Sequence, residues 1–476
     1  MMLSQRAFSY TDQMRFASAA GDFNPMHVDA LQARRTQAGA PVVHGVNLLL
    51  WAFDSLAALR QDLPPLRGFD AQFYNFIYLE EIVQVELIQQ GPEGMRLHIS
   101  VDHVPRSRVT IEFGEPVQET PAWCVTSLEP IPPASVPANQ EFGQSSGRSG
   151  RFAFAMTQED AKVLFPHATK WLGATRICAA AATSYLVGMV CPGLYSTYRD
   201  LSVKTCPVAD LGEQLAFRVT KTDGRFRMVE QEISGGGLTG TIRSFFRTPP
   251  VRQATMESLL GVVGPAEFDG SVALIVGGSR GLGELTAKLI AAGGGHAIVT
   301  WQNGRDDAES VAREIRSAGG TCETLAYDSR RPALEQLASM TEVPTHAYYF
   351  ATPAIFRPQS GFFSSERLSE FLAVYVDGFW NLSQALRTRN PMLSLFYPSS
   401  VAVTDRPRGM TEYTMAKAAG EVLCGYMNVS LAPMRVIVKR LPRLPTDQTS
   451  SNTGAKAYSP LETMLPIIQE VQTWPS

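Results

Sequence analysis

Residues 272–294 read VALIVGGSRGLGELTAKLIAAGG. The apolar start predicts a buried strand, the glycine-rich centre a turn, and the remainder a helix. Gly277 permits the turn, Gly281 allows a pyrophosphate to approach the backbone closely, and Gly283 allows the helix to pack tightly on the sheet. A glycine pattern alone is weak evidence, but this one lies between a strand and a helix. The stretch therefore predicts a dinucleotide-binding loop.

The last third of the chain continues this alternation of strand and helix. Short apolar runs separated by helical segments are typical of βαβ units on a parallel sheet. We therefore expect an α/β, doubly wound domain over residues 268–476. Its expected strands include residues 272–276, 297–300, 347–351, 393–397 and 436–438.

The end of the second expected strand indicates which nicotinamide cofactor is bound. Residues 299–304 read VTWQNG and lack the acidic residue that would hold a ribose 2′-hydroxyl. Arg280 lies inside the glycine-rich loop, where its guanidinium can meet a 2′-phosphate. NADPH is therefore expected in preference to NADH. The loop residues expected to contact it are Gly277, Ser279, Arg280, Gly281, Leu282 and Gly283.

Ser400, Tyr413 and Lys417 form a pattern suited to the reduction of a carbonyl group. Tyr413 and Lys417 lie four residues apart in EYTMAKAAGEVL and share a helix face, while Ser400 follows an expected strand. A nearby ammonium makes a phenol a usable acid near neutral pH, and a serine hydroxyl can hold the carbonyl oxygen. The YxxxK spacing is common by chance, so its weight comes from the serine and the glycine-rich loop.

From about residue 270 onward the chain resembles the short-chain dehydrogenase/reductase family, and within it the ketoacyl reductases. The resemblance implies a Rossmann-like sheet. It also implies that Tyr413 donates the proton, that Ser400 anchors the carbonyl, and that Lys417 binds the ribose and modulates Tyr413. By the same resemblance Asp328, in LAYDS, contacts the adenine.

Three features depart from this family's pattern. Residues 350–354 read FATPA where the family has Asn-Ala-Gly, and Tyr375 stands where a further asparagine is expected. The sequence given ends after the helix-like ETMLPIIQEVQ, without the family's usual last strand, so we expect the sheet to be completed differently or by a partner. Two alternatives stay open: a working reductase, or a reductase-like domain that serves as a structural or dimerisation module.

The first two thirds of the chain divide at a stretch rich in Pro, Ser and Gly. Residues 128–150, LEPIPPASVPANQEFGQSSGRSG, are expected to form a linker between segments 1–127 and 151–250. Each segment combines an apolar helix, at 42–53 or 177–191, with β-rich runs. A helix that is apolar nearly all round must be wrapped, as by a curved antiparallel sheet. We expect two α+β domains related as an internal repeat.

An acid and a base stand close together in the first of these segments. Residues 21–29 read GDFNPMHVD, with Asp22 five residues before His27, and His44-Gly45 opens the apolar helix. A carboxylate and an imidazole can share the proton transfers of hydration and dehydration. The backbone N–H groups near Gly45 can hold a thioester oxygen. The alternative is an ordinary turn with a structural histidine.

The run GDFNPMHVDALQARRTQAGAPVVHG closely resembles the pattern of the MaoC-like, (R)-specific enoyl-CoA hydratases, which have the hot-dog fold. The resemblance covers residues 8–118. It implies that Asp22 and His27 are the catalytic pair and that Gly45 supplies an oxyanion amide. The second segment lacks DxNPxH and offers only His167, so we expect a non-catalytic copy that shapes the acyl tunnel of a double hot-dog.

The composition of the chain indicates which kinds of binding partner to expect. The chain has 476 residues, a net charge of −3 and only 18% charged residues, which disfavours nucleic acid. Its apolar runs are too short for a membrane span, and its N-terminus has no secretory apolar core, so a cytoplasmic location is the expectation. No metal site is expected because the cysteines show no ligand spacing. They are Cys124, Cys178, Cys191, Cys206, Cys322 and Cys424.

The acid–base pair of the first segment and the Ser-Tyr-Lys pattern of the last third together predict a bifunctional enzyme. We also expect a homodimer. The reductase would convert a 3-ketoacyl thioester, carried by CoA or by an acyl carrier protein, into a 3-hydroxyacyl thioester, and the dehydratase would give the 2-enoyl thioester. The same domain types also occur joined in peroxisomal multifunctional enzymes, which hydrate and then oxidise with NAD. This chain lacks the acidic residue that would hold the ribose 2′-hydroxyl of NAD, which favours the reductive direction. The alternative is a dehydratase or hydratase alone.

Overall fold

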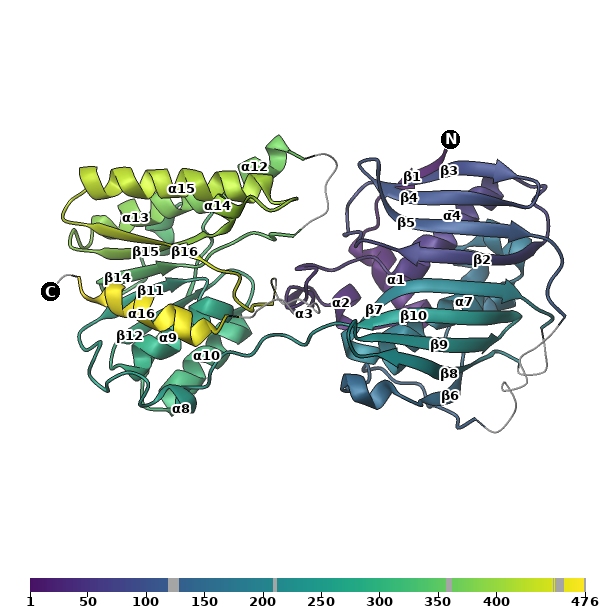
Figure 1. Cartoon of the computed structure of the whole chain (residues 1–476), viewed down its shortest axis with the longest axis horizontal. Helices are drawn as coiled ribbons and strands as arrows, with labels where there is room; N and C mark the ends of the chain where they lie inside the picture. Colours follow the sequence, from purple (N-terminus) through teal and green to yellow (C-terminus); the bar gives the residue numbers. More distant parts are fainter. Residues whose placement is uncertain (119–127, 209–211, 357–361, 448, 450–457, 475–476) are drawn as a thin grey trace. The chain divides into compact units, whose positions relative to one another are not determined.

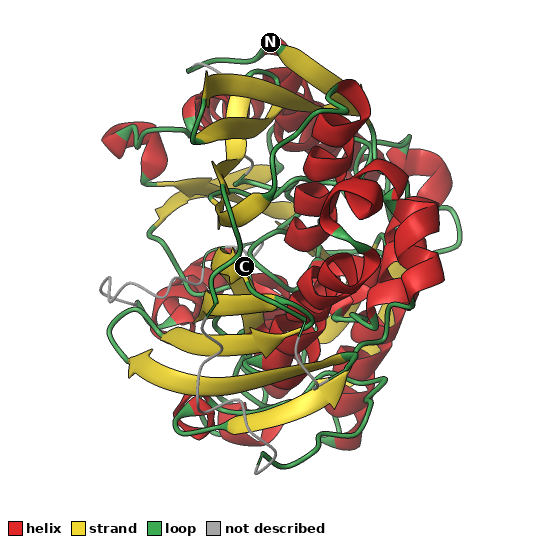
Figure 2. Cartoon of the chain, turned by 90° about the vertical axis from the view of Figure 1, so that its right-hand side faces the viewer, coloured by secondary structure: helices red, strands yellow, loops and turns green. Residues whose placement is uncertain are grey.

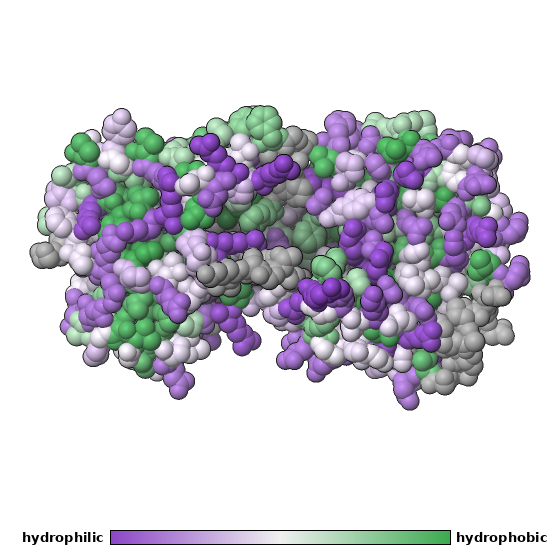
Figure 3. Space-filling model, in the orientation of Figure 1, coloured by the Kyte–Doolittle hydropathy of each residue, from purple (hydrophilic) through white to green (hydrophobic). Residues whose placement is uncertain are grey.

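The computed structural model describes the chain except for residues 119–127, 209–211, 357–361, 448, 450–457 and 475–476. It forms two compact units, Met1–Pro249 and Pro250–Ser476. The end of the first predicted segment, at 119–127, lies outside the described residues. Among the described residues no helix is long and apolar enough to cross a membrane. The face drawn in Figure 3 is mostly hydrophilic, with smaller apolar areas on each unit.

The first unit is built on one antiparallel sheet of ten strands (Figure 1). Its first half runs in the order β1 (Met2–Arg6), β3 (Val83–Gly91), β4 (Gly94–Val101), β5 (Val104–Phe113) and β2 (Leu66–Phe73). Its second half continues with β7 (Ser196–Thr205), β10 (Leu238–Phe246), β9 (Met228–Gly235), β8 (Gln214–Asp223) and β6 (Ser149–Ala153).

The two halves repeat one arrangement, as the sequence predicts. In each half the strand that follows the apolar helix lies at the centre of the sheet, and the earliest strand lies at an edge. The central strands β2 and β7 pair with one another from Gly68↔Lys204 to Gln72↔Asp200. The hydrogen bonds of the sheet therefore run without interruption from one half to the other.

The apolar helices of the two halves pack together against this sheet. They are α4 (Gly45–Leu59) and α7 (Ala174–Tyr185), and they contact one another and strands of their own halves. Figure 2 shows the strands of this unit on one side and the helices on the other. The apolar side chains of both helices and of the sheet belong to one continuous core. Within it, α4 is buried over most of its surface. This confirms the expectation of an α+β hot-dog architecture.

The stretch predicted as a linker has structure of its own. The backbone of Ile131 hydrogen-bonds to Arg151 at the start of β6, and residues Phe142–Ser145 form a short 3₁₀ helix. The Arg148 guanidinium donates to the Val190 carbonyl at 2.9 Å. The described part of 128–150 therefore packs on the second half instead of spanning free space.

The second unit has a parallel sheet with helices on both faces (Figure 1). The strand order is β13 (Thr321–Ala326), β12 (His296–Trp301), β11 (Val272–Val276), β14 (His346–Tyr349), β15 (Ser394–Ser400) and β16 (Arg435–Leu441). One core joins the sheet to α9 (Gly281–Ala292), α10 (Arg305–Ser317) and α16 (Pro460–Gln472). The other joins it to α12 (Ser365–Leu372), α13 (Phe379–Arg387) and α15 (Thr411–Ser430).

This order is that of a doubly wound sheet, so the Rossmann-like α/β prediction is confirmed. The glycine-rich loop connects β11, a central strand, to α9. Ligands of such sheets bind beyond the carboxyl ends of the strands, where the strand order reverses. Here that point lies between β11 and β14, beside the loop.

Candidate active sites

The loop that carries Asp22 and His27 is anchored to the second half of the first unit. Asn24 caps the short helix α2 (Pro25–Val28), since its side chain accepts a hydrogen bond from the Met26 N–H. Its amide nitrogen also donates to the carbonyls of Gly188, at 2.9 Å, and Gly193, at 3.1 Å. Asn24 thus fixes the position of the loop across the join between the halves.

Asp22 is a buried carboxyl group with donors on both oxygens. Ser184, on α7, donates to Oδ2 at 2.6 Å, and the Asn24 N–H donates to Oδ1 at 3.1 Å. Burial raises the pKa of Asp22, while the charge of His27 and these two hydrogen bonds oppose the rise. The net shift is upward, which favours the protonated acid.

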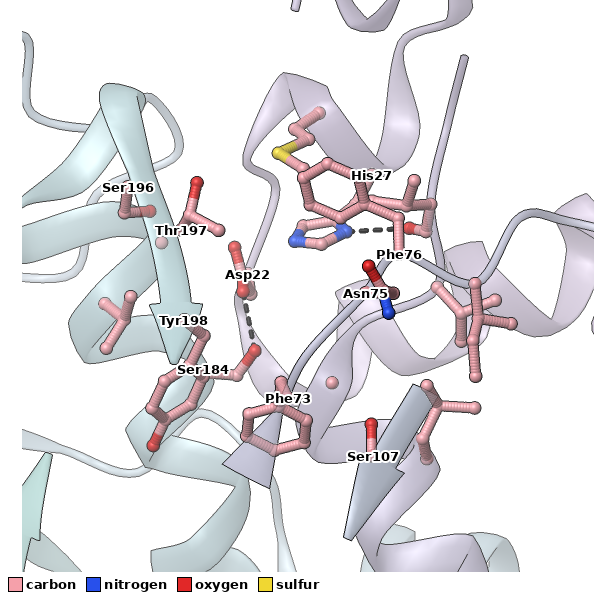
Figure 4. A pocket seen from close by; sticks show the side chains of 18 residues that line it. Asp22, His27, Phe73, Asn75, Phe76, Ser107, Ser184, Ser196, Thr197 and Tyr198 are labelled. Carbon is pink, nitrogen blue, oxygen red and sulfur yellow. Dashed lines mark hydrogen bonds between the residues drawn. The ribbon is translucent and has the colours of Figure 1, made fainter. Parts of the chain in front are cut away.

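His27 faces Asp22 across the same pocket (Figure 4). Its Nδ1 lies 2.7 Å from the carbonyl oxygen of Val42, so Nδ1 carries the proton and Nε2 is left as an acceptor. Burial lowers the pKa of His27 more than the charge of Asp22 raises it. The lowered pKa favours the neutral imidazole, just as the raised pKa of Asp22 favours the protonated carboxyl.

His44 and Gly45 complete this site at the start of α4. The His44 ring stacks on His27 with centroids 3.9 Å apart, and its Nε2 lies 3.1 Å from the Asp22 carbonyl oxygen. Gly45 lines the pocket as the first residue of the helix, so its N–H has no partner within the helix. A Cβ at Gly45 would lie 3.0 Å from the Phe73 ring, which closes the pocket beside it.

The pocket is lined by both halves, although only the first carries the sequence motif. The first half contributes Asp22, His27, Gly45, Phe73 and Asn75, with several apolar side chains. The second half contributes Ser184, Val187, Gly188, Ser196, Thr197 and Tyr198. The sequence analysis did not predict that Ser184 belongs to this site. A hydroxyl within an apolar helix is a weak signal, and nothing local ties it to Asp22.

Asp22, His27 and His44 also lie close enough to raise the question of a metal. Their ligand atoms all lie within 4.8 Å of one another. However, the two imidazole rings stack with an angle of 25° between their planes, and imidazole lone pairs lie in the ring plane. The two rings therefore cannot direct their lone pairs at one ion. This geometry suits proton transfer and does not fit a metal.

The glycine-rich loop of the second unit has the geometry of a phosphate cradle. Gly277 has φ +78°, and a Cβ at Gly283 would lie 2.3 Å from the Gly277 carbonyl oxygen. Glycine is therefore required at both positions. The backbone N–H groups at the start of α9 are available to a pyrophosphate, so the loop fits a nicotinamide dinucleotide.

Other residues predicted to contact the cofactor lie around this loop. Ser279 is buried, and the Leu282 carbonyl accepts the Thr286 hydroxyl inside α9. Arg280, directly before α9, has its Nη1 3.2 Å from Oδ2 of Asp447. Asp328 follows β13 at the carboxyl end of the sheet, and its Oδ1 accepts the Arg330 N–H. Nothing in the sequence signalled the contact between Arg280 and Asp447.

Ser400, Tyr413 and Lys417 come together at the end of β15. The Ser400 hydroxyl hydrogen-bonds to the phenol of Tyr413, and burial raises the pKa of that phenol. Lys417, one turn further along α15, donates from Nζ to the Pro398 carbonyl at 2.7 Å. The structure thus brings the hydroxyls of Ser400 and Tyr413 and the amine of Lys417 to the same end of β15.

Tyr375, at the position that departs from the family pattern, covers the Lys417 side chain. Lys417 Nζ lies 3.8 Å from the centroid of the Tyr375 ring and 5.1 Å from that of Tyr397. The Tyr375 hydroxyl lies 2.5 Å from Oγ1 of Thr352, in the segment that replaces Asn-Ala-Gly. Burial among these rings lowers the pKa of Lys417 to about 7. The ammonium is therefore only partly populated at neutral pH.

Comparison with protein families identifies a domain in each unit. Residues 4–107 match the family model described as MaoC like domain, and residues 271–437 match the one described as KR domain. The chain is 35% identical over 69 residues to a short-chain dehydrogenase/reductase of Aspergillus novofumigatus, a match covering 14% of this chain. A short-chain dehydrogenase/reductase of Pestalotiopsis microspora is 34% identical over 64 residues, or 13% of this chain. The chain spans about a quarter of the length of these curated relatives.

Solved structures similar to this chain include two bacterial enzymes. A 3-oxoacyl-(acyl-carrier-protein) reductase of Agrobacterium tumefaciens with NADP bound is 18% identical, with a TM-score of 0.39, over 43% of this chain and 88% of its own. A dehydrogenase/reductase of Sinorhizobium meliloti is 19% identical, with a TM-score of 0.38, over the same shares. The chain therefore holds one segment that matches the MaoC like domain model and a second, separate segment that matches the KR domain model.

Proposed function

We propose that the chain is a bifunctional enzyme that reduces a 3-ketoacyl thioester with NADPH and dehydrates the resulting (R)-3-hydroxyacyl thioester to a 2-enoyl thioester. The main support for this proposal is the presence of a separate reactive cluster in each unit. Each unit holds its own reactive cluster, Asp22 with His27 in the first and Ser400 with Tyr413 and Lys417 in the second. The product of the second cluster's reaction is the substrate of the first.

Reduction uses the cluster at the end of β15. The Ser400 hydroxyl holds the ketone oxygen, and Tyr413 gives that oxygen its phenolic proton. The Lys417 ammonium stabilises the phenolate that remains. When bound, the nicotinamide cofactor supplies the hydride that adds to the carbonyl carbon.

Dehydration uses Asp22 and His27 in the first unit. His27 Nε2 takes the proton from C2 while Asp22 protonates the hydroxyl that departs from C3 as water. The C2–H and C3–O bonds break and a C2–C3 double bond forms. The Gly45 N–H, at the N-terminus of α4, stabilises negative charge on the thioester oxygen. Proton transfer from His27 back to Asp22 resets the pair.

A second candidate is a dehydratase alone. Its reductase-like unit would then serve only as a structural or dimerisation module. The arrangement of Tyr375 favours this alternative, because its ring covers the ammonium that the cofactor ribose would meet. Titration of the purified chain with NADPH and NADH separates the two. A chain that binds neither nucleotide would support the dehydratase alone.

The direct test is an assay of the purified chain with a short 3-ketoacyl thioester and each reduced nucleotide. Oxidation of NADPH, with formation of a 2-enoyl thioester detected by mass spectrometry, is the expected result. CoA and acyl-carrier-protein thioesters are assayed in parallel, which identifies the carrier. NADPH oxidation without the enoyl product would remove the dehydratase from the proposal.

We also propose a homodimer formed through α15. This helix exposes Val422, Tyr426 and Val429, which recur at helical spacing, and their exposed fractions are 61%, 70% and 82%. A stripe of this kind on a surface helix is suited to association. Sedimentation should give a dimer for the wild type and a monomer for the Val422→Glu, Tyr426→Glu double variant. A wild-type monomer would contradict the proposal.

A further inference from the structure

Arg280, the residue expected to meet a 2′-phosphate, already has a carboxylate partner. Its Nη1 lies 3.2 Å from Oδ2 of Asp447, in the loop after β16. The other oxygen of Asp447 accepts the Val251 N–H at 3.1 Å, so the carboxylate is held from both sides. The Asp447 side chain is only 8% exposed and that of Arg280 26%. Water therefore screens this pair less than it would a pair on the open surface.

The loop that carries Asp447 lies against the glycine-rich loop. A Cβ at Gly281, the first residue of α9, would lie 3.8 Å from Cγ2 of Thr446. The loop is itself held by a turn, in which the Thr446 N–H donates to the Thr449 hydroxyl at 2.9 Å. Two residues 167 positions apart in the sequence thus place a carboxylate beside the expected phosphate site.

A phosphate and a carboxylate would compete for the same guanidinium. A 2′-phosphate that reached Arg280 would have to displace Asp447 or lie close to its negative charge, and both cost binding free energy. NADH carries a hydroxyl at this position and has no such cost. We infer that Asp447 determines nucleotide specificity by weakening the preference of Arg280 for NADPH over NADH.

This inference rests on the proposed nucleotide binding and is tested by binding instead of turnover. Dissociation constants for NADPH, NADH and 2′-phospho-ADP-ribose are measured by calorimetry on the full chain. In Asp447→Asn the remaining amide oxygen can still accept the Val251 N–H, while the charge is removed. Binding of NADPH and of 2′-phospho-ADP-ribose should tighten about tenfold, the effect of one charge at about 6 Å in a partly hydrated site. NADH binding should change less than about twofold.

Controls separate the charge effect from changes in folding. Asp405→Asn, elsewhere in the second unit, should leave all three constants unchanged. In an Arg280→Ala background, Asp447→Asn should tighten NADPH binding less than it does in the wild type, because no guanidinium is left for the carboxylate to occupy. Asp447→Ser, whose hydroxyl can also accept from Val251, serves if the Asn variant unfolds at a lower temperature.

Two outcomes overturn the inference in distinguishable ways. If wild type binds NADPH but Asp447→Asn leaves that affinity unchanged or weaker, Asp447 does not oppose the phosphate, and the proposed function stands without it. If neither the wild type nor the variant binds any of the three nucleotides, both the inference and the proposed reductase fail.

Discussion

Ser184, from the second half of the first unit, donates a hydrogen bond to the carboxyl of Asp22, the proposed catalytic acid. Because Ser184 donates to the carboxylate, it lowers the pKa of Asp22 against the effect of burial. It also orients the oxygen that is proposed to protonate the departing hydroxyl. Ser184 is therefore a positioning residue in this account.

We predict that Ser184→Ala slows dehydration about tenfold and moves the upper limit of its pH range to higher pH. Loss of the donor raises the pKa of Asp22, so the carboxyl stays protonated to a higher pH. The measurement is the pH dependence of kcat/KM for an (R)-3-hydroxyacyl thioester. Ser244→Ala is the matched control, because Ser244 is a buried serine of the same unit whose Oγ has no described partner. A slower variant with an unshifted pH profile would contradict the role given to Ser184.

Lys417 links the stability of the second unit to pH. Burial lowers its folded-state pKa to about 7 from an ordinary value of 10.5. Between these two values the unfolded chain binds a proton that the folded chain does not, so the free energy of unfolding should rise with pH. Below about pH 7 both states are protonated and this dependence disappears.

We predict that wild type gains roughly 1 kcal/mol per pH unit over Lys417→Met between about pH 7.5 and 9.5. Methionine fills a similar volume and carries no charge. Urea unfolding of both proteins at several pH values measures the difference. Curves that stay parallel over this range would show that Lys417 keeps its ordinary pKa in the folded protein.

The residues that sequence spacing could predict are those that share one loop or one helix turn. Asp22 and His27 bracket a single capped turn, and Tyr413 and Lys417 lie one turn apart on α15. The partners of these groups come from distant segments. Asn24 and Gly188 are 164 residues apart, and no local pattern could predict their contact. Pairing across such distances is decided by how the sheet and helices pack.

At the scale of elements, a π-helical turn occurs at each site. Residues Leu186–Val190 continue α7 beside Asp22, and residues Ala373–Gly378 precede α13 and place Tyr375 over Lys417. Such turns shift a helix face by one residue and are common at functional sites. In the first of them, the absence of a side chain at Gly188 leaves room for the Asp22 carboxyl.

We predict that Gly188→Ala abolishes dehydration to below about one hundredth of the wild-type rate, because misplacing a principal acid removes most of its contribution. The added Cβ would lie 2.3 Å from Oδ1 of Asp22, so the carboxyl must move. Gly143→Ala is the control, since a Cβ there meets nothing within 4 Å. The assay is dehydration of the 3-hydroxyacyl thioester, with the melting temperature as a check on folding. Activity retained in Gly188→Ala would contradict the proposed position of Asp22.

Most strands and both apolar helices could be predicted from periodicity, but β13 could not. Its sequence, TCETLA, contains few branched residues and is only partly buried at the edge of the sheet. An edge strand has one neighbour and needs little apolar surface, so the sequence signal is weak. The sequence also did not show that 128–150 packs on the second half, because Pro, Ser and Gly are frequent in both packed and free loops.

At the scale of the whole molecule, the two halves of the first unit share one sheet and form one compact unit. The paired central strands β2 and β7, with the bonds of Asn24 and Ser184, join the halves through backbone and side chains. Residues 1–249 should therefore dehydrate a 3-hydroxyacyl thioester without the second unit. Residues 1–127 should not, because β2 then pairs only with β5 and Asp22 loses its bond from Ser184. Equal activity of the two fragments would show that the second half is dispensable.

The central claim is that two separate sites carry out consecutive steps. Its most direct test is to supply Asp22→Asn with a 3-ketoacyl thioester and NADPH and to identify the product by mass spectrometry. Because Asp22 lies outside the reductase unit, NADPH should be consumed near the wild-type rate and the 3-hydroxyacyl thioester should accumulate, with almost no 2-enoyl product. Formation of the 2-enoyl thioester at the wild-type rate, or equal loss of both steps, would contradict the two-site account.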